Sequence, residues 1–178
     1  MSRQKERDFA ERGEVRLVDA SGPPWIEIAC ELIREYGGTI ADIAACSLQH
    51  QQFDRELAEL PGAYAPPGGR LLVALAGGAP AGCIALRPIE RLGPGVCEMK
   101  RMYVQPAYRG LGIGRLLAER LLEEARTAGY TLMKLDSDVH PRFAAAVALY
   151  RSLGFTDCEN YNGDPDPHTV WMERPLED

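Results

Sequence analysis

A glycine-rich turn near residue 110 has the residue types of an anion-binding site. The turn spans Arg109–Arg115, with glycine at positions 110, 112 and 114, and an amphipathic stretch over residues 111–128 follows it. Glycine has no Cβ, so the backbone can approach a ligand closely. The first turn of a helix adds unpaired N–H groups and the positive end of the helix dipole. We therefore predict an anion site here, and phosphate is the usual occupant.

The spacing of the glycines narrows the choice of ligand. It is G-x-G-x-G, and no lysine follows as it does in the G-x-x-x-x-G-K-[ST] phosphate loop. The third glycine also does not fall where the dinucleotide-binding pattern G-x-G-x-x-G requires it. On the glycines alone, a helix entry that binds no ligand remains an open alternative.

Cysteine and histidine do not suggest a second chemical centre. The five cysteines are scattered and form no C-x-x-C pair, which favours reduced thiols over a disulfide framework. The three histidines are scattered as well, so no metal site is expected. These residues are Cys30, Cys46, Cys83, Cys97, Cys158, His50, His140 and His168.

Hydrophobic periodicity predicts the elements that must position the turn. Gly37-Gly38 is expected to end the first helix, and Gly77-Gly78 to turn a β-hairpin. No repeat or linker interrupts the chain, so we expect one domain over residues 14–178 after a flexible tail, residues 1–13. The predicted strands are 14–20, 71–76, 81–87, 97–104, 131–135, 155–158 and 169–173, and the predicted helices are 25–36, 43–60, 111–128 and 141–153.

The overall composition is that of an ordinary globular protein. The chain has 178 residues, of which 46% are hydrophobic and 26% charged, and its formal net charge is −6. This balance argues against a disordered chain and against a nucleic-acid partner. No apolar run approaches the roughly 20 residues that cross a bilayer, and the charged N-terminus lacks the apolar core of a signal peptide. We expect a cytoplasmic protein with no membrane partner.

Three linked motifs resemble the GNAT superfamily of acyl-CoA-dependent N-acyltransferases. Arg109-x-x-Gly112-x-Gly114 is similar to the R/Q-x-x-G-x-G/A signature of the family. Residues 98–106 resemble the family's central strand, which ends in V-x-P just before the signature. Residues 149–155 resemble its L-Y-x-x-x-G-F motif.

The resemblance covers most of residues 14–175. Residues 52–67 also resemble a bacterial subgroup of acetyltransferases, which adds no substrate. The resemblance implies an α/β (α+β) fold: a mixed, strongly bent sheet of six to seven strands with helices on both faces. The central strand and its neighbour would splay apart, and acetyl-CoA would lie in the gap as co-substrate.

The resemblance also implies which residues bind acetyl-CoA. Backbone amides of the signature loop would hold the pyrophosphate, and an arginine after the loop would add a charge. The end of the central strand would pair with the pantetheine, and a backbone N–H there would polarise the thioester carbonyl. These residues are Met102, Tyr103, Val104, Arg109, Gly110, Leu111, Gly112, Ile113, Gly114 and Arg115.

Two residues match the family's acid and base positions. Glu98 would be the general base for the amine, and the alternative is a structural ion pair with Lys100 or Arg101. A regular strand would place Glu98 on one face with Lys100, Met102 and Val104, and a bulge would break that alternation. Tyr150 would be the acid that protonates the departing thiolate, and the alternative is a packed tyrosine.

Other features of the motifs leave alternatives open. Cys97 could act as a nucleophile, but no histidine lies nearby in sequence, so a core cysteine and direct transfer are favoured. Phe143 replaces an asparagine that many family members carry, which puts that contact with CoA in doubt.

The resemblance places the acceptor site in residues 25–69 and 160–168. Four aspartates and three tyrosines could border it, or they could be solvated carboxylates and partial core. They are Asp136, Asp138, Asp164, Asp166, Tyr36, Tyr64 and Tyr161.

The sequence thus predicts an N-acetyltransferase that moves an acetyl group from acetyl-CoA to a primary amine of a small molecule or peptide. Transfer would be direct, in a ternary complex, and without a metal. The resemblance also allows a homodimer. The alternative is a CoA-binding sensor that keeps the fold and transfers nothing, although the presence of Glu98 and Tyr150 argues against it.

Overall fold

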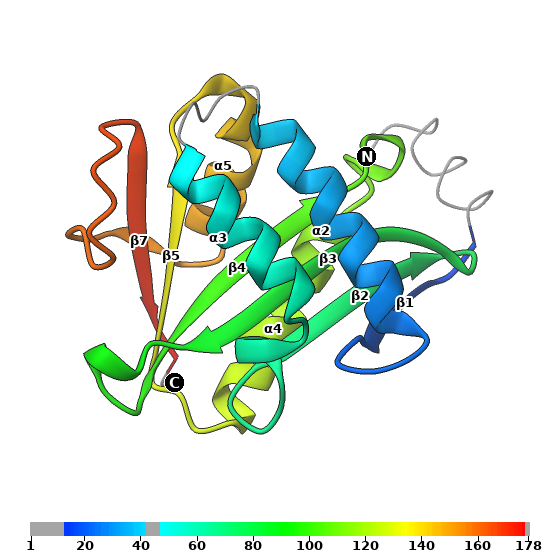
Figure 1. The fold of residues 1–178 in the computed structure, drawn as a ribbon, viewed down its shortest axis with the longest axis horizontal. Coiled ribbons are helices and arrows are strands. Elements are labelled where there is room, and N and C mark those ends of the chain that lie inside the picture. The colour runs from blue at the N-terminus through cyan, green and yellow to red at the C-terminus, as the bar shows by residue number, and fades with distance from the viewer. Residues whose placement is uncertain (1–12, 42–46, 177–178) are drawn as a thin grey trace.

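The computed structural model describes residues 13–41 and 47–176. Its centre is a seven-stranded sheet with the order β1-β2-β3-β4-β5-β7-β6 (Figure 1). The strands are β1 (Val15–Asp19), β2 (Arg70–Ala76), β3 (Ala79–Pro88), β4 (Val96–Val104), β5 (Leu132–Asp138), β6 (Thr156–Asp157) and β7 (Thr169–Pro175). The α-helices are α2 (Trp25–Ala41), α3 (Ser47–Ala58), α4 (Ile113–Thr127) and α5 (Ala144–Ser152).

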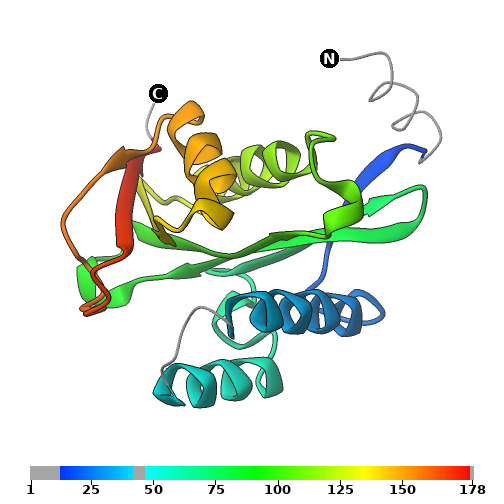
Figure 2. The ribbon, with the colours of Figure 1, turned by 90° about the horizontal axis from the view of Figure 1, so that it is seen from above.

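Helices cover both faces of the sheet. In Figure 2, α4 and α5 lie on one face, and α2 and α3 lie on the other. The apolar stripe of α4 is buried, including Leu117 and Leu121, and packs on strand residues such as Ile84 and Met133. A second core under α2 contains Leu32 and other apolar side chains. The predicted layers are therefore confirmed.

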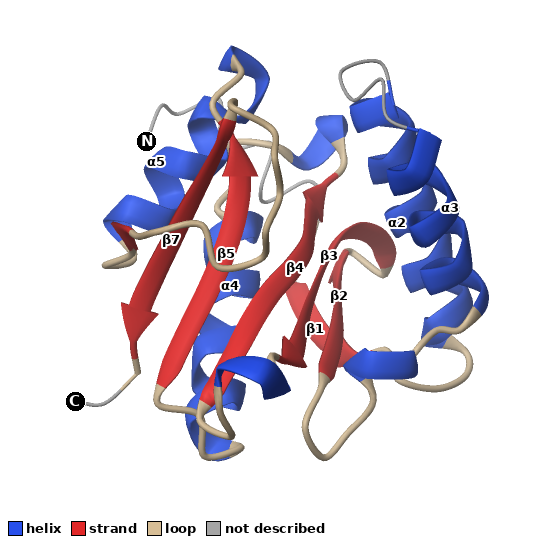
Figure 3. Cartoon of the chain, turned by 60° about the vertical axis from the view of Figure 1, so that its left-hand side comes forward, coloured by secondary structure: helices blue, strands red, loops and turns tan. Residues whose placement is uncertain are grey.

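The sheet is mixed, and its two central strands, β4 and β5, pair over only part of their length. Strand β4 pairs with β5 in parallel, whereas the other pairings are antiparallel. The β4–β5 pairing comprises only Val96–Leu132, Cys97–Met133 and Glu98–Lys134. Beyond these pairs β4 and β5 diverge towards their C-terminal ends (Figure 3). The predicted splay of the central strands is confirmed.

A bulge in β4 decides which side chains face the two helical layers. Cys83 pairs with Tyr103 and Ala85 with Lys100, so Arg101 and Met102 together oppose the single residue between Cys83 and Ala85. Before the bulge, Met99 packs in the core under α4; after it, Met102 and Val104 pack against that same core. Glu98 therefore does not share a face with Met102, in contrast to the alternation of a regular strand.

Helix α2 does not end at Gly37-Gly38, contrary to the sequence prediction. It runs on to Ala41, because Gly37 lies where α2 meets α3. A Cβ on Gly37 would lie 2.4 Å from Cε1 of Phe53. Glycine costs about 1 kcal/mol in a helix interior, and the close packing of the two helices offsets that cost.

Other element boundaries shift less. Helix α4 starts at Ile113 rather than at residue 111, and the predicted helix 141–153 divides into a 3-10 turn (Pro141–Phe143) and α5. The predicted start of the second helix at Ile43 and the predicted tail, apart from Gly13, lie outside the described residues. Within the described ranges, no helix has the length and apolar character needed to span a membrane.

The two neighbouring glycines of α2 give a matched stability test. Gly37→Ala places its Cβ against Phe53, whereas Gly38→Ala meets nothing within 4 Å. Both gain the same helix propensity, so their difference isolates the overpacking, for which we expect about 1–3 kcal/mol in favour of Gly38→Ala. Urea unfolding of both variants measures the difference. Equal stabilities would contradict the close contact with Phe53.

Candidate active site

The signature loop presents backbone N–H groups at the start of α4. Gly110 and Gly112 have φ of 78° and 82°, a region that glycine enters without steric cost. Gly112 caps the helix, and the first intrahelical bond runs from the Leu116 N–H to the Gly112 carbonyl at 3.1 Å. In the described part of the chain, the amides of residues 110–115 have no recorded acceptor. They are therefore available to an anion.

The third glycine brings this loop close to β4. A Cβ on Gly114 would lie 3.0 Å from Met102 Cε and 3.5 Å from Leu149 Cδ2, so a larger residue would require these side chains to shift. Arg109 holds the other side of the loop, because its Nε donates to the Val104 carbonyl at 3.0 Å. The open amides thus lie beside the diverging end of β4.

Arg115 lies at the outer edge of the loop. Its guanidinium donates to Ser152 Oγ at 2.6 Å and pairs with Glu119 at 3.3 Å. The side chain is half exposed, so its charge is still accessible to a ligand from solvent.

Tyr150 lies on α5 and belongs to the core that α4 covers. Its side chain is only 7% exposed and packs edge-on against Phe155, with ring centroids 6.1 Å apart. Burial raises the pKa of its hydroxyl, and Tyr36 and Asp136 raise it further. The hydroxyl has no hydrogen-bond partner among the described residues. Every fully buried side-chain oxygen of those residues has a partner, so the Tyr150 hydroxyl oxygen is not fully buried. It therefore keeps some access to solvent or to a ligand.

Glu98 is a buried carboxylate with charged partners on both oxygens. Oε2 accepts from Arg87 Nε at 2.8 Å and pairs with Arg87 Nη2 at 2.7 Å. Oε1 accepts from the Tyr161 hydroxyl at 2.7 Å, and Lys100 Nζ lies 3.8 Å away. Lys100 in turn binds Asp136 at 2.8 Å. This network lies on the face opposite the α4 core.

Of the two ion-pair partners expected for Glu98, Lys100 and Arg101, the structure brings only Lys100 near it, and Arg87 is its main partner. Lys100 lies beside it, but Arg101 does not pair with it and binds Glu56 instead. Sequence reasoning missed Arg87, which is the direct cross-strand partner of Glu98. The only signal in the sequence was a basic residue at the end of the predicted strand 81–87, and its use required the strand register.

Helix α3 is tied to β4 by a second buried network. Arg101 Nε and Nη2 each donate to the Glu56 carboxylate at 2.6 Å. The Tyr64 hydroxyl also donates to Glu56, at 2.7 Å, and the ring of Phe53 lies 4.9 Å from the guanidinium carbon. Arg101 has φ of 55°, a backbone conformation that costs a non-glycine residue about 1–2 kcal/mol.

The Glu56 carboxylate predicts a specific pH dependence of stability. Burial by itself would raise its pKa, but hydrogen bonds and charge from Arg101, together with the Tyr64 hydroxyl, lower it below the ordinary value of 4.5. Its stabilising effect is therefore complete above about pH 4.5 and is lost as the pH falls through the lowered pKa. Glu56→Gln is expected to be less stable at pH 7 and to lose less stability below pH 4.5 than wild type. Parallel stability curves from urea unfolding would contradict this.

The remaining cysteine and aromatic candidates have mostly structural roles. Cys97 is fully buried, and burial raises its pKa to about 12, so it is a poor nucleophile. Tyr64 is core, and Tyr36 packs against Tyr103 with ring centroids 5.9 Å apart. Phe143 precedes α5 and makes no side-chain cap.

Of the four aspartates, only Asp136 joins the Glu98 network. Asp138 accepts from the His140 N–H at 2.6 Å, and Asp164 and Asp166 accept from backbone N–H groups two residues ahead. These three therefore stabilise turns.

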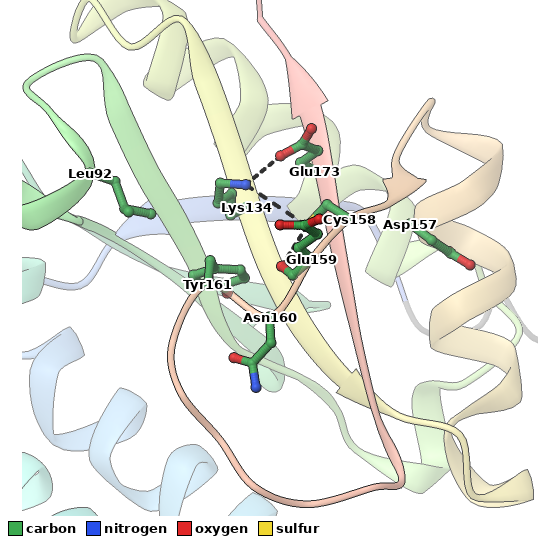
Figure 4. A pocket seen from close by; sticks show the side chains of 8 residues that line it. All are labelled: Leu92, Lys134, Asp157, Cys158, Glu159, Asn160, Tyr161 and Glu173. Carbon is green, nitrogen blue, oxygen red and sulfur yellow. Dashed lines mark hydrogen bonds and ion pairs between the residues drawn. The ribbon is translucent and has the colours of Figure 1, made fainter.

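One hollow of the described surface borders the Glu98 network, and another lies on the α4–α5 side of the sheet. The hollow in Figure 4, of about 470 Å³, is bordered by Tyr161 and by Lys134, which contacts Glu173 and lies 3.8 Å from Cys158 Sγ. The other, of about 390 Å³, lies along α4 and α5 and includes Arg115. Tyr150 borders neither of them.

Comparisons with known proteins found relatives of this chain in sequence and in fold. The model of the acetyltransferase (GNAT) family matches residues 30–155. The chain is 39% identical to an uncharacterised N-acetyltransferase of Schizosaccharomyces pombe, over 80% of each chain. It is 38% identical to the IAA acetyltransferase of Azospirillum brasilense, over 86% of this chain and 94% of the relative. The PaiA N-acetyltransferase of Thermoplasma acidophilum, solved with coenzyme A, superposes with a TM-score of 0.67 at 20% identity, covering 91% of this chain and 99% of that one.

Proposed function

Because this chain belongs to the GNAT family of acetyltransferases, we propose that it acetylates a primary amine of a small molecule or peptide by direct transfer. The chain is an acetyl-CoA-dependent N-acetyltransferase, and the proposal concerns its acceptor and its mechanism. One observation carries it. The open amides of residues 110–115 lie beside the end of β4 that diverges from β5, because a Cβ on Gly114 would be 3.0 Å from Met102 Cε.

The donor side of the gap fits an acyl-CoA. The amides of residues 110–115 and the dipole of α4 would bind the pyrophosphate, and Arg115 would add a cation. Among the described residues, β4 pairs with β5 only through Val96, Cys97 and Glu98, so Met102–Val104 have no strand partner on that side, although the Val104 carbonyl accepts from Arg109. The pantetheine amides would pair with that edge, and a backbone N–H would hold the thioester oxygen.

Tyr150 would be the general acid. Burial raises the pKa of its hydroxyl, so it stays protonated at neutral pH. It would give its proton to the departing thiolate sulfur as the carbon–sulfur bond breaks, and regain a proton from solvent after release of product. A tyrosine that served only in packing would be expected to bond its buried hydroxyl to the protein, and Tyr150 has no such bond among the described residues.

Glu98 would be the general base. Oε1 accepts one hydrogen bond of normal length, from Tyr161, and so keeps a lone pair for the proton of the attacking amine. The proton would reach it directly or through one water. Arg87 and Lys100 would hold the carboxylate in place on the face of β4 that α3 covers.

The first test is thermal unfolding with acetyl-CoA, free CoA and NADH. At 100 times its dissociation constant, a ligand of the folded state adds about 2.7 kcal/mol, which raises the melting temperature by about 5–10 °C. We expect a shift with acetyl-CoA and CoA but not with NADH. A primary-amine library is then screened for acetyl-CoA-dependent thiol release. A shift without turnover of any amine would favour a CoA-binding sensor, and no shift would overturn the assigned donor site.

A further inference from the structure

Arg101 is in an unusual position at the centre of β4. It is the one non-glycine residue of the described ranges with a positive φ, at 55°. It lies in the bulge, directly after Lys100 and directly before Met102. The bulge thus separates the strand into a part that carries the Glu98 network and a part that carries the proposed pantetheine-binding edge.

The bulge sets the direction of the residues on both of its sides. Because two residues oppose one, Met102 faces α4 instead of α3, and its Cε lies within 3.0 Å of the Cβ position of Gly114. The side chain of Arg101 faces α3. The backbone conformation of Arg101 therefore affects two contacts of β4: the contact of Met102 with the signature loop and the contact of Arg101 itself with α3.

Two side chains from the predicted acceptor-side segment contact the Arg101 guanidinium. Glu56 accepts two hydrogen bonds of 2.6 Å from it, and the ring of Phe53 covers it. The Tyr64 hydroxyl donates to Glu56 Oε1, the oxygen that also accepts from Arg101 Nε. Arg101 and Glu56 are only 15% and 22% exposed, so water competes little for this pair.

An exposed ion pair at the end of α3 looks different. Arg55 of α3 and Glu59, which directly follows the helix, are 2.8 Å apart, but their side chains are 80% and 59% exposed. Such an exposed pair contributes little to stability. It provides an internal control for the buried pair, because Glu59 lies three residues after Glu56 along the chain.

We propose that Arg101 is a positioning residue for acetyl transfer, and that its pairing with Glu56 couples the acceptor-side helix α3 to the edge of β4 that holds the thioester. This inference rests on the proposed function. The pair would fix the distance between the acceptor wall and the amides after the bulge. Geometry of this kind affects the reacting complex strongly, since a displacement of about 1 Å can cost about 100-fold in rate.

The test compares Glu56→Gln, Arg101→Gly and Arg101→Lys with the control Glu59→Gln. Glycine accepts the positive φ of position 101, so Arg101→Gly removes the guanidinium without adding strain. Calorimetry with free CoA and acetyl-CoA, and steady-state kinetics with an acceptor amine from the screen, are measured for each. Far-ultraviolet circular dichroism and melting curves select a temperature at which every variant is folded.

We expect a separation of binding from turnover. For Glu56→Gln and Arg101→Gly, kcat should fall by about 10–100-fold and the acceptor KM should rise, while the dissociation constant of free CoA stays within about threefold. Arg101→Lys keeps the charge but loses the two-pronged contact, so its kcat should lie between those of wild type and Arg101→Gly. Glu59→Gln should match wild type.

Three results would overturn the inference. In the first, the buried-pair variants keep the kcat and acceptor KM of Glu59→Gln, which leaves the proposed function intact. In the second, free CoA binding and kcat fall together, which indicates a general loss of structure rather than of positioning. In the third, wild type itself binds no acetyl-CoA, which removes the proposed function and this inference with it.

Discussion

Tyr150→Phe is expected to lower kcat by about 10²–10⁴-fold while acetyl-CoA binds within about threefold of wild type. The substitution removes one oxygen whose hydroxyl has no protein partner among the described residues, so folding loses no hydrogen bond there. The ring still packs against Phe155. The thiolate must then leave without a proton donor, and this penalty acts in the transition state only. Steady-state kinetics and calorimetry measure the two effects separately.

Tyr130→Phe is the matched control for Tyr150→Phe. Tyr130 is also buried, at 8% exposure, but its hydroxyl donates to the Gly68 carbonyl at 2.8 Å, away from the gap. Its loss should cost stability, about 0.5–1.5 kcal/mol for one hydrogen bond, and leave kcat unchanged. If Tyr150→Phe kept the wild-type kcat, Tyr150 would be a packing residue and the proton would come from another group.

Gly112→Glu is expected to weaken acetyl-CoA binding by about 100-fold, which corresponds to about 2.7 kcal/mol. Nothing lies within 4 Å of a Cβ at this position, so the side chain fits in the protein itself. Its carboxylate would stand at the start of α4, where the open amides and the helix dipole attract anions. The carboxylate would compete with the phosphates for the open amides and would repel their negative charge. Calorimetry with acetyl-CoA measures the loss.

Gly78→Glu separates this effect from backbone strain. Gly78 lies in the β2–β3 turn with φ of 86°, close to the 82° of Gly112, and it too has nothing within 4 Å. Both variants therefore place a side chain at a similar positive φ, and only one of them lies in the signature loop. We expect Gly78→Glu to bind acetyl-CoA as wild type does. Equal affinities of the two variants would place the phosphates elsewhere on the protein.

The two substitutions test the two parts of the proposed donor site. Gly112 belongs to the site that would hold the phosphates, and Tyr150 to the site of bond breaking. The first should therefore change binding and the second turnover. A protein that only binds CoA would respond to the first substitution and have no turnover for the second to reduce.

The signature loop and its helix could be read from the sequence because their chemistry is local. Within seven residues, the chain carries the glycines that accept positive φ and the start of an amphipathic helix, and no distant residue is needed to form open amides. The splay of the central strands was implied by the family resemblance of the motifs, and the structure confirms it. Even so, Gly37 was misread as a helix end, because its reason is a contact with Phe53 on another helix.

Only the tertiary structure decided the partners of the charged residues. Glu98 meets Arg87, and Arg101 meets Glu56, through the register of β3 and β4 and through a bulge of one residue. A shift of one residue moves every later side chain to the other face of a strand, and hydrophobic periodicity does not locate such a shift. The fold and the glycine-rich loop proposed to bind the donor were therefore predictable from the sequence. The three-dimensional packing determined which carboxylates and cations are brought together on the acceptor face, because those contacts join residues that are far apart along the chain.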